Sequence, residues 1–175
     1  DNNLFAAFKF YKRAIESGIK PIIGATVSIH PGASERISKL ILLCKNTTGY
    51  KNLSNLITRS YLEGYHKGKV LVDIDWLDGK STLGLVAISG GYNGFNQNLL
   101  LSEKSRTASQ QVERLQLIFP EDLFLQIHKL GGNRDEELLE KTVEIASLAE
   151  VPLLAGNNPR FLNQDDYLSL DARVC

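Results

Sequence analysis

The sequence predicts an α/β fold in which strands alternate with helices. Three features support this prediction: short apolar runs rich in β-branched residues, amphipathic segments with helical spacing between them, and short connections that contain glycine or proline. Such units build a parallel sheet that either stays open or closes into a barrel, and periodicity alone does not distinguish the two forms. With 175 residues, 43% of them hydrophobic, the chain is expected to form one domain with a substantial core.

The first two predicted elements are a helix and a strand. Apolar residues recur at helical spacing over residues 4–17, two asparagines precede them as candidate caps, and Gly18 marks the end. Residues 20–29 are rich in β-branched side chains and run into a His-Pro-Gly turn signal at 30–32. A helix and then a strand that ends in a loop are therefore expected.

The middle of the chain continues the alternation. Residues 37–45 form a continuous apolar run, which is typical of a central strand buried on both faces. From Thr48, apolar residues line one helical face until Gly64 interrupts it. Residues 83–88 then predict a further buried strand.

Two more pairs of elements follow. A helix over residues 108–119 is stopped by Pro120, and residues 123–127 predict a strand. Asn133 and Glu136 have the spacing of a capping box at the start of the next helix.

The chain is expected to end with a strand and a helix. Residues 151–155 predict the strand, and Asn163 and Asp166 have capping-box spacing for the helix. In an α/β fold, functional residues lie at the carboxyl ends of the strands. The loops of interest are therefore residues 28–31, 89–94, 128–132 and 156–160.

Composition excludes several classes of protein. Twenty basic residues balance twenty acidic ones, which disfavours a stand-alone nucleic-acid binder. No apolar run is long enough for a membrane span, and a signal-peptide pattern is absent, so no membrane association is expected. Cys44 and Cys175 are expected to be reduced thiols in the cytoplasm. The chain contains no methionine, even at position 1, which suggests a piece of a longer protein.

Four segments, in the same order and spacing, resemble the PHP (polymerase and histidinol phosphatase) domain of bacterial DNA polymerase III α subunits. They are residues 3–11 (NLFAAFKFY), 18–24 (GIKPIIG), 46–53 (NTTGYKNL) and 88–91 (ISGG). The resemblance implies a distorted (βα)7-type barrel that is incomplete at its N-terminus. Residues 1–175 would be a single PHP domain fragment without the first strand and the first metal-binding motif, and the polymerase palm and fingers would follow residue 175.

Active members of this family resemble multinuclear metallohydrolases, in which imidazoles and carboxylates hold metals that activate water. The matching positions in this chain have lost those groups. Thr26 stands where an acidic ligand is expected, and Leu130 stands where a histidine is expected. Asn158 and Arg160 replace an acidic ligand and a histidine, and a guanidinium does not bind metal.

A later histidine of the family falls at Leu170, so the resemblance implies a degenerate domain with no metal and no hydrolytic activity. One substitute ligand stays open: His128 lies two residues before Leu130, and the period of a strand would keep it on the same face. The alternative for His128 is an ordinary histidine at a strand end. Arg160 is a candidate partner for Asp165 or Asp166, which would stabilise the former site without metal.

Other candidate residues have simpler explanations. His66 lies in a small basic and aromatic loop that either contacts a phosphate backbone or is merely solvated. Asp73, Asp75 and Asp78 lack the spacing of a calcium loop and are expected to cap a short helix. Cys44, in an apolar strand, is expected to be a buried, unreactive thiol.

The functional prediction follows from the resemblance. The parent protein is expected to be a DNA-directed DNA polymerase, with Mg²⁺ held in its palm domain and DNA contacted by the rest of the chain. This fragment would be a scaffold and a docking site for the proofreading exonuclease subunit and other replicase subunits. The alternatives are a metal-dependent phosphoesterase or 3′–5′ exonuclease with a rearranged site, and an unrelated βα-barrel enzyme.

Overall fold

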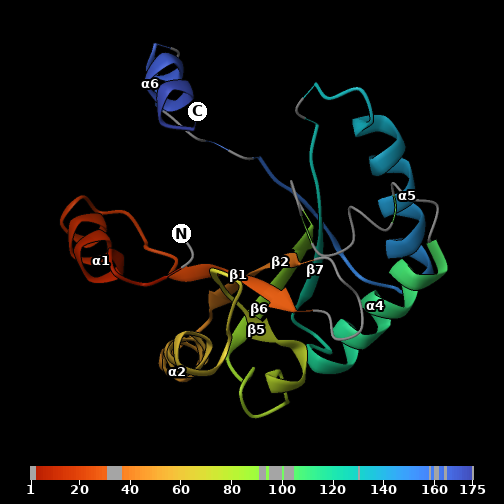
Figure 1. Ribbon diagram of the computed structural model, residues 1–175, viewed down its shortest axis with the longest axis horizontal. Helices are drawn as coiled ribbons and strands as arrows, with labels where there is room; N and C mark the ends of the chain where they lie inside the picture. The colour runs from red at the N-terminus through yellow and green to blue at the C-terminus, as the bar shows by residue number, and fades with distance from the viewer. Residues whose placement is uncertain are drawn as a thin grey trace.

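The computed structural model contains a six-stranded sheet flanked by helices, and a separate two-stranded hairpin (Figure 1). It describes residues 3–30, 37–90, 94, 100, 105–129, 131–157, 159, 162–163 and 165–174. The sheet has the order β5-β1-β2-β6-β7-β8, with β1 Gly24–His30, β2 Ser38–Cys44, β5 Val72–Asp73, β6 Leu85–Gly90, β7 Leu123–Ile127 and β8 Leu153–Ala155. The hairpin consists of β3 Tyr65–His66 and β4 Lys69–Val70. The helices are α1 Ala7–Glu16, α2 Thr47–Glu63, the 3-10 helix η1 Ile74–Trp76, α4 Ser105–Ile118, α5 Asp135–Leu148 and α6 Asp166–Val174.

The α/β class is confirmed, but the expectation of an all-parallel sheet is wrong in one respect. β2 pairs antiparallel with both β1 and β6, whereas β5 with β1, β6 with β7, and β7 with β8 pair in parallel. A parallel pair needs a long crossover, and only residues 31–37 connect β1 to β2. Five strands therefore run in one direction and β2 runs in the other. The described strands form an open sheet with β5 and β8 at its edges.

One face of the sheet, which we call the packed face, carries the hydrophobic core. Most alternate residues of the central strands are buried on this face, and Val27, Leu40, Leu42 and Ala87 are at most 5% exposed. These side chains form one cluster with buried residues of α2, α4 and α5. Burying a leucine stabilises a fold by roughly 1.5–3 kcal/mol, so this face supplies most of the packing energy.

The opposite face, which we call the open face, is less completely covered. Thr26, Ile41 and Phe124 are only partly buried there, and Leu154 is 38% exposed. Ile88, although 7% exposed, is not part of the core cluster. Residues 37–45 were expected to be buried on both faces, but β2 alternates between fully and partly buried positions over most of its length.

The helix ends follow the sequence signals in part. α1 begins three residues later than expected, and Gly18, at φ +70°, ends it with Ile19 donating a backbone hydrogen bond to Ala14. Asn46 caps α2 by accepting a hydrogen bond from the Gly49 N–H at 3.0 Å.

The capping box predicted from Asn133 and Glu136 is wrong. Arg134 is the N-cap residue of α5 and makes no side-chain capping bond, while Glu136 pairs with Lys129. The turn before α5 is held instead by Asp135, whose carboxylate accepts a hydrogen bond from the Gly132 N–H at 3.1 Å. At the start of α6, half of the predicted box is present, because Asp166 accepts from the Asn163 N–H at 3.1 Å.

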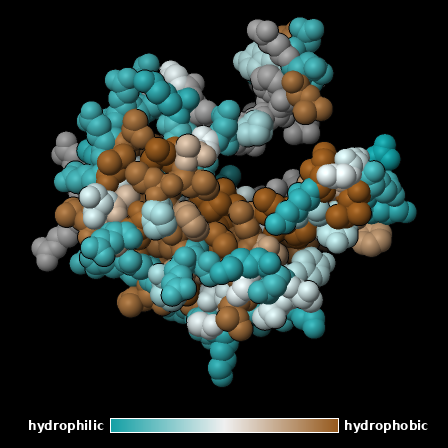
Figure 2. Space-filling model, turned by 180° about the vertical axis from the view of Figure 1, so that it is seen from behind, coloured by the Kyte–Doolittle hydropathy of each residue, from teal (hydrophilic) through white to brown (hydrophobic). Residues whose placement is uncertain are grey.

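Both terminal helices extend away from the sheet (Figure 1). Their apolar side chains remain exposed: Phe8 by 78% in α1, and Leu168 by 74% in α6. From behind, apolar side chains gather in a broad area across the middle of the molecule (Figure 2). The chain therefore exposes more apolar surface than a domain whose apolar side chains all pack into its core.

Candidate functional site

The carboxyl ends of β1, β5, β6, β7 and β8 lie along one margin of the sheet, because these five strands run in the same direction. The four loops singled out from the sequence begin at this margin, as predicted. The open face at this margin is where the family's ligand positions are expected.

Thr26 lies in β1 on the open face, in a row with Ile41, Ile88 and Phe124 from the three neighbouring strands. All three neighbours in this row are apolar. Metal ions in proteins bind carboxylate, imidazole, thiolate or carbonyl groups, and desolvating a cation beside apolar side chains is costly. The surroundings of Thr26 do not suit a metal.

The next row toward the strand ends is polar but has no carboxylate. Ser28 pairs with Lys39 across β1 and β2, and Gly90 pairs with Gln126 across β6 and β7. The side-chain amide of Gln126 lies directly against Gly156, where an added Cβ would collide with it. This row offers hydroxyl, ammonium and amide groups, which are poor substitutes for metal-binding carboxylates.

His128 follows the end of β7 and is partly buried. No cluster of three or more His, Cys, Asp or Glu side chains with metal-binding geometry occurs among the described residues, and His128 therefore has no such set of co-ligands there. Leu130, Asn158 and Arg160 lie outside the described residues, and so does the proposed pairing of Arg160. For Leu170 the structure gives the backbone, which lies in α6.

The described residues therefore do not fit the metal cluster of an active family member. The row around Thr26 is apolar, and the groups near Gln126 are hydroxyl, ammonium and amide groups in place of carboxylates.

Of the three acidic residues around Trp76, Asp73 caps a short helix as expected, whereas Asp75 and Asp78 make other contacts. Asp73 caps η1 by accepting a hydrogen bond from the Asp75 N–H at 2.9 Å, and Asp75 pairs with Arg114. Asp78 accepts from the N–H groups of Lys80 and Ser81, and these hydrogen bonds, Ser81 first, lower the pKa of its carboxyl group.

The loop with His66 is a tight β-hairpin. His66 pairs with Lys69, and the two residues between them, Lys67 and Gly68, both have positive φ angles. His66 is exposed, so the hairpin accounts for this segment without a ligand.

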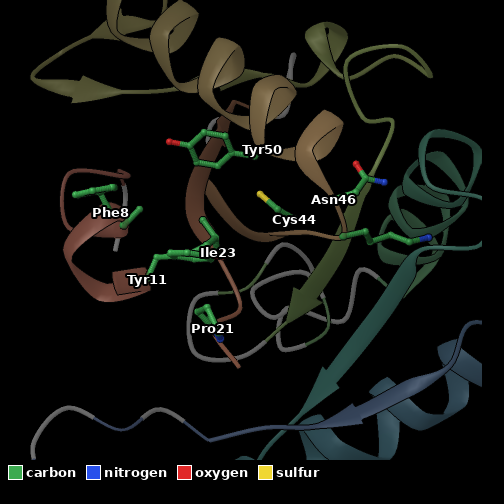
Figure 3. Close-up of a pocket in the computed structure, with 9 residues that line it drawn as sticks. Phe8, Tyr11, Pro21, Ile23, Cys44, Asn46 and Tyr50 are labelled. Atoms are coloured by element: carbon green, nitrogen blue, oxygen red, sulfur yellow. The ribbon is translucent and has the colours of Figure 1, made fainter. Parts of the chain in front are cut away.

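Cys44 is a free thiol that lines an apolar cavity of about 400 Å³ between α1, β2 and α2 (Figure 3). Burial raises the pKa of this thiol, which keeps it protonated and unreactive near neutral pH. Besides Cys44, the described residues that line the cavity are Ala7, Phe8, Tyr11, Pro21, Ile23, Lys45, Asn46 and Tyr50. The ammonium of Lys45 is paired with Asp122 at 2.8 Å. The described lining is therefore mainly apolar, and its one ammonium group is already paired.

A second, polar cavity, which includes Arg59 and Trp76, was not predicted from the sequence. These residues are 17 positions apart, and no known motif links them. The only local signal is the spacing of Arg59 and Glu63, which is typical of a helical ion pair; the two side chains lie 2.8 Å apart.

In the part of the chain that the structure describes, no helix has the length and apolar character needed to cross a membrane.

Comparisons with known proteins agree with the architecture. A family model described as "PHP domain" matches residues 1–129. The chain is 34% identical over 175 residues to the DNA polymerase III subunit alpha of Pseudomonas aeruginosa, 38% identical over 179 residues to that of Xylella fastidiosa strain Temecula1, and 33% identical over 173 residues to that of Escherichia coli K12. These alignments cover 98–99% of this chain but only 14–15% of each relative. The chain thus spans about one seventh of the length of the curated relatives that it matches.

Proposed function

Since the chain belongs to the PHP domain family, and resembles bacterial DNA polymerase III α subunits over almost its whole length, we propose that it is the PHP domain of such a subunit. The parent protein would carry out template-directed DNA synthesis in the bacterial cytoplasm. Nucleotidyl transfer and its Mg²⁺ would belong to carboxylates of the palm domain outside this chain, and DNA would be contacted there.

The domain itself would act as a non-catalytic scaffold. The observation that supports this role most directly is the row of Ile41, Ile88 and Phe124 beside Thr26 on the open face. A site that activates water on a metal needs charged ligands, and apolar neighbours at these positions favour packing instead. The complete core on the packed face supports a structural role as well.

Metal content and hydrolysis test the non-catalytic role. The parent subunit, purified without chelator, is expected to hold no stoichiometric metal in this domain and to hydrolyse no generic phosphate ester when Mn²⁺ or Zn²⁺ is added. A parent subunit with the polymerase carboxylates mutated serves as the matched control, because it removes metal bound in the palm. Two or more bound metals with turnover that His128→Ala abolishes would overturn the proposal and favour the phosphoesterase or 3′–5′ exonuclease alternative.

We propose in addition that the domain docks the proofreading exonuclease subunit and contacts other subunits of the replicase. The surplus of exposed apolar side chains supports an interaction role. Size-exclusion chromatography of the parent subunit with the purified exonuclease subunit tests this idea. We expect the parent subunit and the exonuclease subunit to co-elute. We expect this co-elution to be lost when this domain is exchanged for a distant PHP domain. Co-elution that survives the exchange would assign docking to another part of the parent.

A further inference from the structure

A polar cavity of about 330 Å³ lies between α2 and the segment that includes η1. Its described lining residues are Asn52, Asn55, Leu56, Arg59, Trp76, Asp78, Lys80 and Ser81. One wall comes from a single helix and the other from a tight turn. Such a concave site with a few fixed polar groups is a typical place for a ligand to bind.

Arg59 is held in a fixed orientation at this cavity. The carbon of its guanidinium group lies 4.2 Å from the centroid of the Trp76 ring, and its Nε donates a hydrogen bond to Glu63 at 2.8 Å. Its two terminal amino groups have no acceptor among the residues that the structure describes. A guanidinium that is already stacked and oriented loses little entropy when it binds a carboxylate through two parallel hydrogen bonds.

The opposite wall is also rigid. Asn52 donates its amide hydrogens to the carbonyl oxygens of Lys80 and Leu83, at 3.0 and 2.9 Å. Asp78 accepts from the backbone N–H groups of Lys80 and Ser81, at 3.0 and 2.7 Å. These bonds fix the turn that carries Lys80, whose positive charge also acts on the carboxylate of Asp78.

We propose that this cavity binds a carboxylate of an acidic segment of a partner protein, with Arg59 as its principal contact and the Trp76 ring and Leu56 beneath the neighbouring apolar side chain. Arginine and tryptophan are the residues that most often dominate binding at protein interfaces. Asp78 lies in the lining and Glu63 is paired with Arg59, so a chain of phosphates would meet like charges repeatedly. A single carboxylate needs only the free edge of the Arg59 guanidinium and meets that repulsion once. The charges therefore favour a protein segment over a nucleic acid, and this proposal is independent of the scaffold role.

Binding of the complete parent polypeptide to an immobilised peptide tests the proposal. The probe is acetyl-Gly-Leu-Asp-Leu-Gly-amide, linked at one end, and the control peptide has asparagine in place of the aspartate. Binding is expected to be saturable, and about tenfold weaker for the asparagine peptide, since losing one charge-assisted contact changes affinity by about that factor. Equal binding of the two peptides, no binding, or a preference for an oligothymidylate would overturn the proposal.

Matched variants locate the site. Arg59→Met is expected to weaken binding about tenfold, and Arg59→Lys to restore only part of it, because lysine lacks the planar fork. Arg13→Met, at an exposed arginine in α1, is expected to leave binding unchanged. Lys80→Met gives a second variant if Arg59→Met is unstable. If Arg59 and Lys80 variants bind as well as Arg13→Met, the cavity is not the site.

Discussion

The two faces of the sheet differ in what covers them, although the same strands supply both. On the packed face, alternate residues such as Leu40 and Leu42 are fully buried under α2, α4 and α5. On the open face, the intervening residues, such as Thr26 and Ile41, are only partly buried. The packed face can hold the fold together whatever occupies the ligand positions on the other face. The packing of the domain therefore does not depend on ligand groups on the open face.

The comparison is tested most strongly by trimming neighbouring leucines of β2. Leu42→Ala on the packed face is expected to lower the free energy of unfolding by about 4 kcal/mol, because it removes a fully buried side chain and leaves a cavity. Leu43→Ala on the open face removes the same atoms from a partly buried position and is expected to cost about 1 kcal/mol. Urea unfolding measures both values. Equal costs would show that the open face is as well packed as the other.

The second largest effect is expected where α2 packs against the rest of the fold. An added Cβ at Gly49 would collide with the backbone carbonyl of Gly84, so neither side can yield easily. Gly49→Ala is expected to destabilise the fold by about 3 kcal/mol through overpacking. Gly79→Ala meets no atom nearby and serves as the matched control, with almost no expected change. A stable Gly49→Ala variant would mean that α2 can move off the packed face at little cost.

A smaller effect is expected at the cap of the same helix. Asn46→Ala removes the acceptor of the Gly49 N–H and is expected to cost about 1 kcal/mol. Asn55→Ala, in the exposed middle of α2, removes no capping bond and should change the melting temperature little. Thermal unfolding followed by circular dichroism distinguishes the two. If both variants melt alike, the cap contributes nothing to the cover of the packed face.

The smallest expected effect is a pH dependence in α5. Hydrogen bonds from Arg134, and then from Lys141, lower the pKa of the Glu137 carboxyl from 4.5 to about 2. The ionised form is favoured in the folded state, so this contribution is present above pH 4.5 and is lost as the pH falls toward 2. Glu137→Gln is expected to flatten the fall of the melting temperature over that range. Glu144→Gln, at an exposed carboxylate of the same helix, is the control, and an equal flattening there would assign the effect to general charge.

Much of the fold was predictable because local patterns determine single elements. The predicted strand over residues 123–127 coincides with β7, and Gly64 marks the end of α2 as expected. The direction of β2 was not predictable, since the turn signal at residues 30–32 indicates a loop but not where the chain goes afterwards. The prediction of the α5 cap was wrong because the side chain of Asp135, and not that of Asn133, holds the preceding turn.

The site was predictable to a smaller extent. The replaced ligand positions came from a resemblance, and the part of this prediction that involves Leu130, Asn158 and Arg160 remains a prediction. The apolar neighbours of Thr26 come from three other strands, and their register cannot be obtained from local spacing. The same is true of Arg59 and Trp76, which meet only because α2 and η1 pack side by side.

The reversed central strand also has a kinetic consequence. β1 and β2 are close in sequence and pair directly. The pairing of β6 with β7 and of β7 with β8 requires long crossovers through α4 and α5. Pairings that are local in sequence close first, because they lose less chain entropy. The β1–β2 pair is therefore expected to belong to the folding nucleus, so that substitutions there slow folding, while substitutions in β8 mainly speed unfolding.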